Sequence, residues 1–285
     1  MEITKKTRTS DVLSFIRCKL ALEKDVEDLL DQYKAAKPFP HLVLDNLFPA
    51  ETLDSLIDEM PPMTSEKWVH ERHEEFTKSN LRSAVDLGDL SSEFASMLHS
   101  AAFLYFLTEI TGIRALLPDP YLSGGGYHVF PEGGQFHVHA DRNTDHNSGL
   151  ERRLAMLIYL NKDWKHDYGG QLELWNQKGT ACEIVIEPAF NRTVIFEIGD
   201  KNFHGVRPVT GKHGRSRMSF ALYFHTVGKG LVFHNSLYAP SIYQDKKKKI
   251  GIRGVVREVL PPVLFKTIKG VVAAVKQYKK PVKPS

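Results

Sequence analysis

The sequence predicts an α+β protein in which helices come first and a barrel or sandwich of antiparallel strands follows. Up to Gly112, long segments repeat apolar residues at helical spacing. After Gly124, short β-type runs alternate with turns that contain glycine. Because the helices precede the strands and do not alternate with them, an antiparallel core supported on one side by helices is favoured over a parallel sheet.

The first helix is expected over residues 11–36, where apolar side chains recur at helical spacing behind a serine or aspartate cap. Pro38 and Pro40 end it, since proline cannot continue a helix. A short strand over residues 41–45 follows, and Pro49 is suited to the first turn of another helix.

The next stretch, residues 61–90, is polar and is expected to be irregular. Residues 92–111 are rich in apolar side chains and predict one further helix, which Gly112 terminates. The strands are then expected over five short runs: residues 154–160, 171–175, 184–186, 193–198 and 218–225.

Composition places the chain among ordinary globular proteins. Apolar residues make up 42% and charged residues 25% of the 285 positions, without a run of eighteen apolar residues that could span a membrane. The N-terminal stretch lacks the apolar core of a secretory signal. The two cysteines, Cys18 and Cys182, form no disulfide framework. We therefore expect a cytoplasmic protein.

The positive charge is concentrated at the C-terminal end. Residues 246–285 hold ten lysines, two arginines and one glutamate, a balance of +11, so that the other 245 residues carry −7 of the total of +4. Residues 263–278 have the spacing of an amphipathic helix. Packing against the barrel or exposure to solvent is the simpler expectation for this tail. Attachment to an anionic membrane surface or an acidic partner is the alternative, whereas nucleic acid is disfavoured because aromatic residues do not interleave the basic run.

One motif suggests a metal site. His139 and Asp141 form an H-x-D pair, and the end of a strand presents residues two apart on one face. Two histidines and one carboxylate with open positions are the ligand set of non-haem iron(II) oxygenases. The pair alone has little weight, because one or two such matches arise by chance among thirteen histidines and 34 acidic residues. A second match, His73 with Glu75, lies in a polar stretch and is interpreted as surface.

Downstream residues raise the weight of this pair. His204 follows a strand of the buried type and a turn. Its separation from His139 along the chain is one at which a barrel brings a later strand to the same open end. Arg217 and Ser219 then lie at the start of another strand, where residues two apart share one face. A buried arginine is costly unless an anion binds it. His137 with His139 could instead indicate a cupin or zinc site. The glutamate of the cupin pattern is missing, however, and zinc would leave Arg217 unexplained.

The segment from Arg152 to His225 resembles the prolyl hydroxylases of the Fe(II)- and 2-oxoglutarate-dependent oxygenase superfamily, especially the EGL-nine type. The matching motifs are Y-L-N-K-D-W at residues 159–164 with G-G-x-L at 169–172, E-P-x-F-x-R at 187–192, and H-G-V-x-P at 204–208. The resemblance implies a double-stranded β-helix, the jelly-roll or cupin-like barrel. For the chain as a whole we expect an N-terminal helix over 1–37, an oxygenase domain over 38–245 and the basic amphipathic tail over 246–285.

The resemblance further assigns roles. It implies Fe(II) at His139, Asp141 and His204, with 2-oxoglutarate and O2 as co-substrates and ascorbate as a reductant. Arg217 is expected to pair with the distal carboxylate of 2-oxoglutarate. Three further residues are expected around that co-substrate: Tyr159, Ser219 and Leu172. Five residues are candidates for lining the site: His128, Phe130, His137, Phe196 and Arg215, the last being the rival anion anchor.

The substrate stays open at this stage. An intact Asp141 favours hydroxylation over halogenation, since halogenating relatives replace that carboxylate. Peptidyl proline is the first expectation, yet a small metabolite, glycan or lipid-linked substrate is an alternative, because the departures from the family pattern lie on the substrate side. They include Phe130, where the family often has tyrosine, and the polar insert at residues 142–151. A catalytically silent barrel that only binds is the alternative from another class. The sequence does not indicate an oligomeric state.

Overall fold

The structure is a computed structural model that describes residues 25–82, 84–119, 121–210, 214–228 and 237–238. The chain divides into two compact units, Met1–Ser241 and Ile242–Ser285. The second unit, and with it the basic tail and its expected helix, lies outside the described residues, as does the first part of the expected helix over 11–36. No helix among the described residues is long and apolar enough to cross a membrane.

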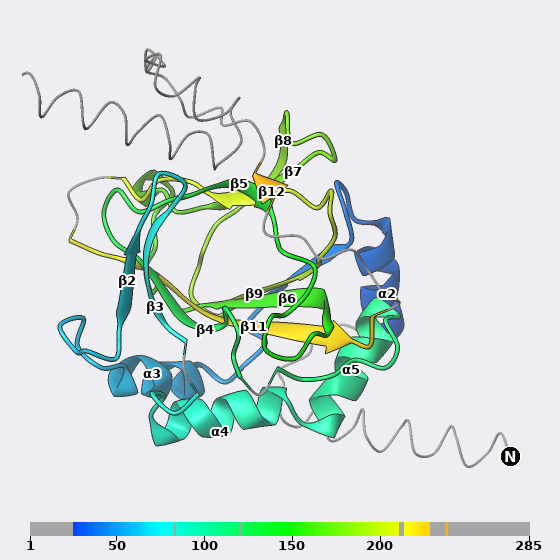
Figure 1. Ribbon diagram of the computed structural model, residues 1–285, viewed down its shortest axis with the longest axis horizontal. Coiled ribbons are helices and arrows are strands. Elements are labelled where there is room, and N and C mark those ends of the chain that lie inside the picture. Colours follow the sequence, from blue (N-terminus) through cyan, green and yellow to red (C-terminus); the bar gives the residue numbers. More distant parts are fainter. Residues whose placement is uncertain (1–24, 83, 120, 211–213, 229–236, 239–285) are drawn as a thin grey trace, which may run out of the picture. The chain divides into compact units, whose positions relative to one another are not determined.

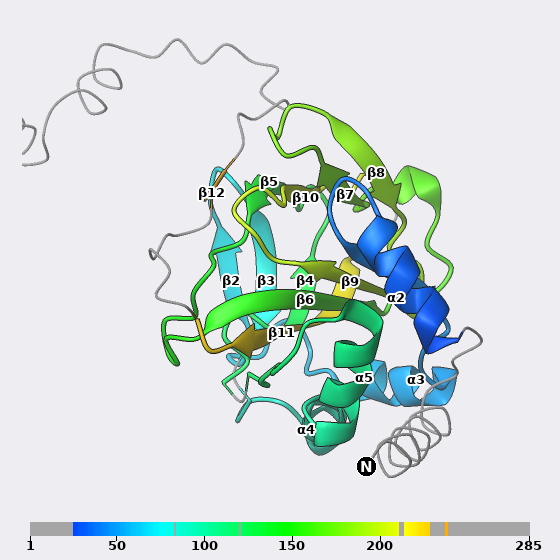
Figure 2. The same cartoon turned by 90° about the vertical axis from the view of Figure 1, so that its right-hand side faces the viewer.

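Two antiparallel sheets face one another (Figures 1 and 2). The seven-stranded sheet has the order β1-β9-β6-β11-β4-β3-β2, and the five-stranded sheet has the order β12-β5-β10-β7-β8. The strands of the larger sheet are β1 His41–Asp45, β2 Val69–Arg72, β3 Thr77–Leu81, β4 Gly126–Phe130, β6 Glu151–Tyr159, β9 Arg192–Glu197 and β11 Arg217–Thr226. Those of the smaller sheet are β5 Phe136–Ala140, β7 Leu172–Trp175, β8 Cys182–Ile186, β10 His204–Val206 and β12 Leu237–Tyr238.

From β4 to β11 the chain passes back and forth between the two sheets. β4, β6, β9 and β11 belong to the larger sheet, whereas β5, β7, β8 and β10 belong to the smaller one. This alternation winds two antiparallel sheets into one jelly-roll barrel. The fold is therefore the double-stranded β-helix that the sequence predicted, and the five strands expected from the sequence are present with their ends shifted by at most three residues.

Within the described residues, four helices cover the outer face of the larger sheet (Figures 1 and 2). They are α2 Val26–Ala35, α3 Ala50–Glu59, α4 Asp89–Leu98 and α5 Ala101–Thr111, and a short 3₁₀ turn, η1 His166–Tyr168, lies between β6 and β7. The prediction of one helix over 92–111 was wrong, because the chain breaks after Leu98. Ser100 accepts a hydrogen bond from the backbone N–H of Phe103 and so caps a new helix, α5. Gly112, at φ 73°, ends α5 as expected.

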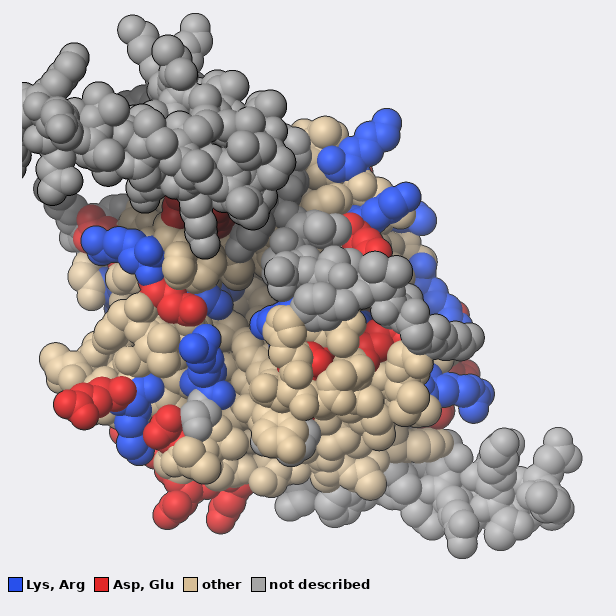
Figure 3. Space-filling view, viewed as in Figure 1, with Lys and Arg blue, Asp and Glu red and all other residues tan. Residues whose placement is uncertain are grey.

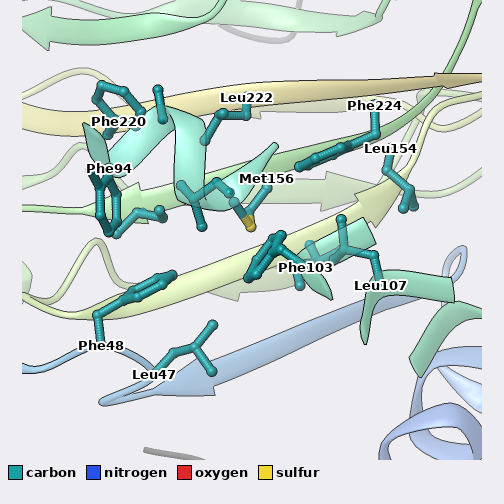
Figure 4. Packing of buried hydrophobic residues seen from close by; sticks show 14 of the residues in the cluster. Leu47, Phe48, Phe94, Phe103, Leu107, Leu154, Met156, Phe220, Leu222 and Phe224 are labelled. Carbon is teal, nitrogen blue, oxygen red and sulfur yellow. The ribbon is translucent and has the colours of Figure 1, made fainter. Parts of the chain in front are cut away.

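The core joins these helices to the sheet (Figure 4). Phe94 of α4 and Phe103 of α5 pack with Phe220 and Phe224 of β11, with ring centroids 5.8 and 6.4 Å apart in the two pairs. Met156 of β6 lies in the same buried cluster. Because alternate residues of β11 point to opposite faces, this packing turns Arg217, Ser219 and Tyr223 toward the inside of the barrel.

The expectation that residues 61–90 are irregular was also wrong, since β2 and β3 form a hairpin there. β2 is an edge strand whose side chains are mostly exposed, so it has no apolar alternation by which it could be recognised. β3 pairs with β4 at Leu81 and Ser79, and the segment before it reaches the smaller sheet, where Phe76 bridges to Phe136. β3 and the residue before it thus connect the larger sheet to the smaller one on this side of the barrel.

Candidate metal and co-substrate site

Three side chains converge inside the barrel between the two sheets. His139 on β5 and His204 on β10 lie directly opposite one another in register, and Asp141 follows the end of β5. The Nε2 of His139 is 3.5 Å from Asp141 Oδ1, and the Nε2 of His204 is 3.7 Å from Asp141 Oδ2. All three side chains are buried, and their ligand atoms lie within 4.8 Å of one another.

Backbone hydrogen bonds fix the orientation of both imidazoles. His139 Nδ1 donates to the carbonyl oxygen of His137 at 2.7 Å, and His204 Nδ1 donates to that of Asn202 at 3.1 Å. With the proton on Nδ1, the lone pair of each ring is on Nε2, the atom that faces Asp141. Such a bond on the remote nitrogen is what orients histidine ligands of metals.

The charge states also suit a metal. Burial lowers the pKa of His204 to about 4, so its ring is neutral at pH 7. Burial raises the pKa of Asp141, but His204 and His139 lower it by more, and the net pKa lies well below the usual value. Asp141 Oδ2 is buried without a hydrogen-bond partner among the described residues. A buried carboxylate oxygen without a partner is costly unless a cation binds it, so the three residues fit a divalent metal ion.

A second charged group lies deeper in the barrel. Arg217, at the start of β11, is 1% exposed. Its guanidinium donates to Tyr159 Oη at 3.1 Å, to Ser219 Oγ at 3.2 Å and to the carbonyl oxygen of Gly170 at 3.3 Å. No carboxylate of the described residues lies within ion-pair distance of it. Burial lowers the pKa of Arg217, as expected for a buried cation that no carboxylate neutralises.

Aromatic and aliphatic side chains enclose this guanidinium. It lies over the rings of Phe130 and Tyr159, at 5.0 and 4.7 Å from their centroids. Leu172, Phe196 and Tyr159 belong to one buried cluster. Of the residues expected around the co-substrate, Tyr159 and Ser219 contact Arg217 directly, and Leu172 belongs to the same buried cluster as Tyr159.

Glycine and asparagine in the motifs hold the pocket in shape. Gly170 has φ 71°, and a Cβ there would meet Cγ of Arg217 at 3.1 Å, so the motif glycine admits the arginine. Asn161 accepts a hydrogen bond from the N–H of Met218 at 2.6 Å and donates to the carbonyl oxygens of Met218 and Pro188. The L-N-K-D-W segment therefore anchors the start of β11, which carries Arg217.

Three of the other candidates for lining the site differ in what they contact. Phe196 contacts His204 with ring centroids 4.7 Å apart. His128 lies opposite Ser219 in register, donates from Nε2 to the carbonyl oxygen of Gly124, and has a pKa that burial lowers well below its usual value. His137 is half-buried and accepts from Gln135.

Arg215 was the rival of Arg217 as the anion anchor. It is exposed, donates to the carbonyl oxygen of Lys162 and lines an outer cavity of about 540 Å³ with Met218. Arg217, and not Arg215, contacts Tyr159 and Ser219.

Three residues near the metal position were missed from the sequence. Tyr223 lies within hydrogen-bonding range of Asp141, which together with burial raises the pKa of the phenol. Arg152 lies over the Tyr223 ring at 4.3 Å and pairs with Asp145 at 3.7 Å. Lys78 on β3 is close enough to interact electrostatically with Asp141 and Arg217. The alternation of β11 could have indicated Tyr223, whereas Lys78 lies in the stretch that was taken as irregular.

Comparison with known proteins agrees with this geometry. Residues 125–225 match the family model of the 2OG-Fe(II) oxygenase superfamily. The chain is 27% identical over 215 residues to the mouse prolyl 3-hydroxylase OGFOD1. The aligned segment covers 72% of this chain but only 36% of that protein. The chain thus spans about a third of the length of this curated relative.

Solved structures show the same fold. A prolyl 4-hydroxylase from Pseudomonas putida superposes with a TM-score of 0.53 at 19% identity, covering 72% of this chain and all of that one. A Trichoplax adhaerens prolyl hydroxylase, solved with a peptide of hypoxia-inducible factor, superposes with a TM-score of 0.50 at 17% identity, covering 70% and 90%. Residues 125–225, which match the family model of the 2OG-Fe(II) oxygenase superfamily, contain His139, Asp141, His204 and Arg217, and the relatives found by sequence and by fold are prolyl hydroxylases.

Proposed function

We propose that this chain is an Fe(II)- and 2-oxoglutarate-dependent hydroxylase whose first substrate class is peptidyl proline. One observation carries the proposal. Two imidazole Nε2 atoms and an ionised carboxylate with one oxygen that has no hydrogen-bond partner among the described residues lie in the same barrel as a buried arginine without a counter-ion. A metal and a dicarboxylate would satisfy both needs.

The residues have separate tasks in this proposal. His139, Asp141 and His204 would hold Fe(II), and Arg217 with Tyr159 and Ser219 would bind the distal carboxylate of 2-oxoglutarate. Fe(II) with 2-oxoglutarate and O2 supplies the oxidising power that places one oxygen atom on a C–H bond while 2-oxoglutarate becomes succinate and CO2. The buried clusters around Tyr159 and Phe130 exclude water from the pocket.

Proline as the target is supported by relatives. The mouse relative is named a prolyl 3-hydroxylase, and the solved structures are prolyl hydroxylases, one of them with a peptide bound. The retained Asp141 supports hydroxylation. Ascorbate as a reductant and a cytoplasmic location remain predictions, as does binding of residues 246–285 to an anionic membrane or acidic partner.

Succinate release tests the proposal. The full chain is incubated with Fe(II), 2-oxoglutarate and ascorbate, with and without a panel of proline peptides and cell extract, and products are searched by mass spectrometry for the gain of one oxygen atom. Omission of ascorbate shows whether the reductant is needed. We expect His139→Ala to abolish succinate release, while His166→Ala, whose side chain is 78% exposed, keeps it.

The alternatives are distinguished by the same assay. Succinate release coupled to oxygen incorporation in the extract, but in none of the peptides, would indicate a metabolite, glycan or lipid-linked substrate. Absence of succinate with every substrate in a metal-loaded protein would indicate a binding module and overturn the proposed function.

A further inference from the structure

Lys78 lies at the rim of the metal site, between the two sheets. Its Nζ is 5.1 Å from the ring centroid of Phe136 and 5.6 Å from that of Phe76. The Phe136 ring is stacked on the imidazole of His139, with centroids 3.9 Å apart. The ammonium group is therefore held over two half-buried rings, of which the inner one contacts a candidate metal ligand.

Lys78 has no anionic partner of its own. It makes no hydrogen bond or ion pair within the described part of the chain. Glu71 lies opposite it in register, but the Glu71 carboxylate accepts a hydrogen bond from Asn80 and lies 3.7 Å from the guanidinium of Arg82. Burial lowers the pKa of Lys78 to about 8, with Glu71 and Asp141 acting against this decrease, so that the ammonium is still mostly protonated at pH 7.

The loaded site would not supply the missing anion either. Two positive charges of Fe(II) and one of Arg217 are balanced by the carboxylate of Asp141 and the two of 2-oxoglutarate. His128, the other nearby titratable group, is neutral because burial lowers its pKa well below 6.5. Lys78 is then one half-buried positive charge in excess, beside the rings of Phe76 and Phe136. Outside the site, acidic and basic side chains are interspersed on the face seen in Figure 3.

We propose that Lys78 binds a carboxylate of the substrate and so selects substrates with an acidic group close to the carbon that is oxidised. This inference rests on the proposed function and narrows its substrate class. A lysine acts as a point charge on a flexible stem, so it selects charge and position more than shape. The carboxylate could belong to an acidic residue one or two positions from the target proline, or to a free amino acid.

Binding without turnover tests this. The full chain is loaded with Fe(II) and 2-oxoglutarate under argon, and the affinity of labelled proline peptides is measured by fluorescence anisotropy. Each peptide carries one glutamate one or two positions before or after the proline, and its twin carries glutamine there. Free proline and prolinamide are compared as competitors. The variants are Lys78→Gln and Lys78→Arg, with Lys178→Gln in the exposed turn between β7 and β8 as the matched control. Thermal unfolding checks that each variant is folded.

We expect wild type and Lys178→Gln to bind at least one ligand that has the carboxylate, a glutamate peptide or free proline, about tenfold more tightly than its uncharged counterpart, the glutamine peptide or prolinamide. Lys78→Gln should remove this preference, Lys78→Arg should keep part of it, and the Kd for 2-oxoglutarate should stay within about twofold in all of them. A preference in the peptides identifies a side-chain carboxylate, and one confined to free proline identifies a free amino acid.

Three results would overturn the inference: no pair is distinguished by wild type, the preference survives in Lys78→Gln, or Lys78→Gln weakens 2-oxoglutarate binding about tenfold. The last would make Lys78 a co-substrate contact. Succinate release measured separately in air distinguishes failure of the proposed hydroxylase function from failure of the proposed carboxylate site. Its absence with the charge preference intact contradicts the hydroxylase but not the carboxylate site, and its presence without any preference contradicts the carboxylate site alone.

Discussion

His139 and His204 face each other across two antiparallel strands, and their ring centroids are 4.5 Å apart. Each ring donates a hydrogen bond to a backbone carbonyl and packs against one aromatic ring, Phe136 in the case of His139 and Phe196 in the case of His204. The two Nε2 atoms are therefore positioned by the backbone of the sheet together with these two rings. Asp141 is the one member of the cluster whose free oxygen lacks a partner within the described residues, which makes it the most sensitive position for metal binding.

Asp141→Asn should lower metal affinity by roughly a hundredfold or more, because even groups that only support metal ligands contribute ten- to hundredfold. Calorimetric titration with Mn(II), which does not require turnover, measures this. Asp58→Asn on the exposed face of α3 is the control. Unchanged Mn(II) affinity in Asp141→Asn would contradict the assignment of this carboxylate as a ligand.

Arg217→Met should abolish stabilisation by 2-oxoglutarate while leaving the ligand-free protein about as stable as wild type. The reason is that the buried guanidinium lacks a counter-ion, so its removal relieves a desolvation cost. In wild type, ligand at a hundredfold excess over its Kd adds about 2.7 kcal/mol, seen as a rise in Tm. A rise of equal size in Arg217→Met would show that the co-substrate binds elsewhere.

Tyr159→Phe should weaken 2-oxoglutarate binding about tenfold with little change in fold. The ring stays in the core, but the hydroxyl that accepts from Arg217 is lost, and hydrogen bonds to charged groups contribute about 1.5–3 kcal/mol. The Kd for 2-oxoglutarate, followed by thermal shift, reports the change. Tyr121→Phe, at a side chain that is 61% exposed, should have no effect.

Asn161→Ala should destabilise the fold by about 2–4 kcal/mol, since it leaves the N–H of Met218 and the carbonyl oxygen of Pro188 without their partner and removes one of the two donors to the carbonyl oxygen of Met218. It should also weaken 2-oxoglutarate binding, because Arg217 is the neighbour of Met218. Urea unfolding measures the first effect and thermal shift the second. Asn176→Ala, in the exposed turn after β7, also removes hydrogen bonds but should leave the Kd for 2-oxoglutarate unchanged.

Stability should fall as the pH decreases from 6.5 to 4. Burial lowers the pKa values of His225 and His99 to about 4, and neither nitrogen of His225 has a hydrogen-bond partner among the described residues. Between these pKa values and 6.5 the unfolded chain binds protons that the folded chain does not, so protonation favours unfolding. Above pH 6.5 both forms are neutral and the effect vanishes. His225→Phe should make the decrease shallower in urea unfolding at a series of pH values, and an identical slope would exclude His225 as a source.

Local patterns in the sequence were enough for much of this protein. The short apolar runs of β6, β9 and β11 and the glycine that ends α5 predicted those elements, because each is set by neighbours within a few residues. The hairpin of β2 and β3 was missed because its pairing partners, and not its own composition, make it a strand. The break between α4 and α5 depends on a single cap at Ser100, which a continuous apolar pattern conceals.

The site divides in the same way. The sequence by itself determined which residues could bind a metal and an anion, since His139 with Asp141 and Arg217 with Ser219 lie two apart on strands. The sequence also favoured His139 with Asp141 over the equally spaced His73 with Glu75, and the tertiary structure gives the physical reason: the barrel brings His204 opposite the first pair, whereas His73 is exposed. Only the tertiary structure placed Lys78 beside the metal position. Ligand spacing is a local property of a strand, but convergence depends on contacts between distant segments that no local pattern specifies.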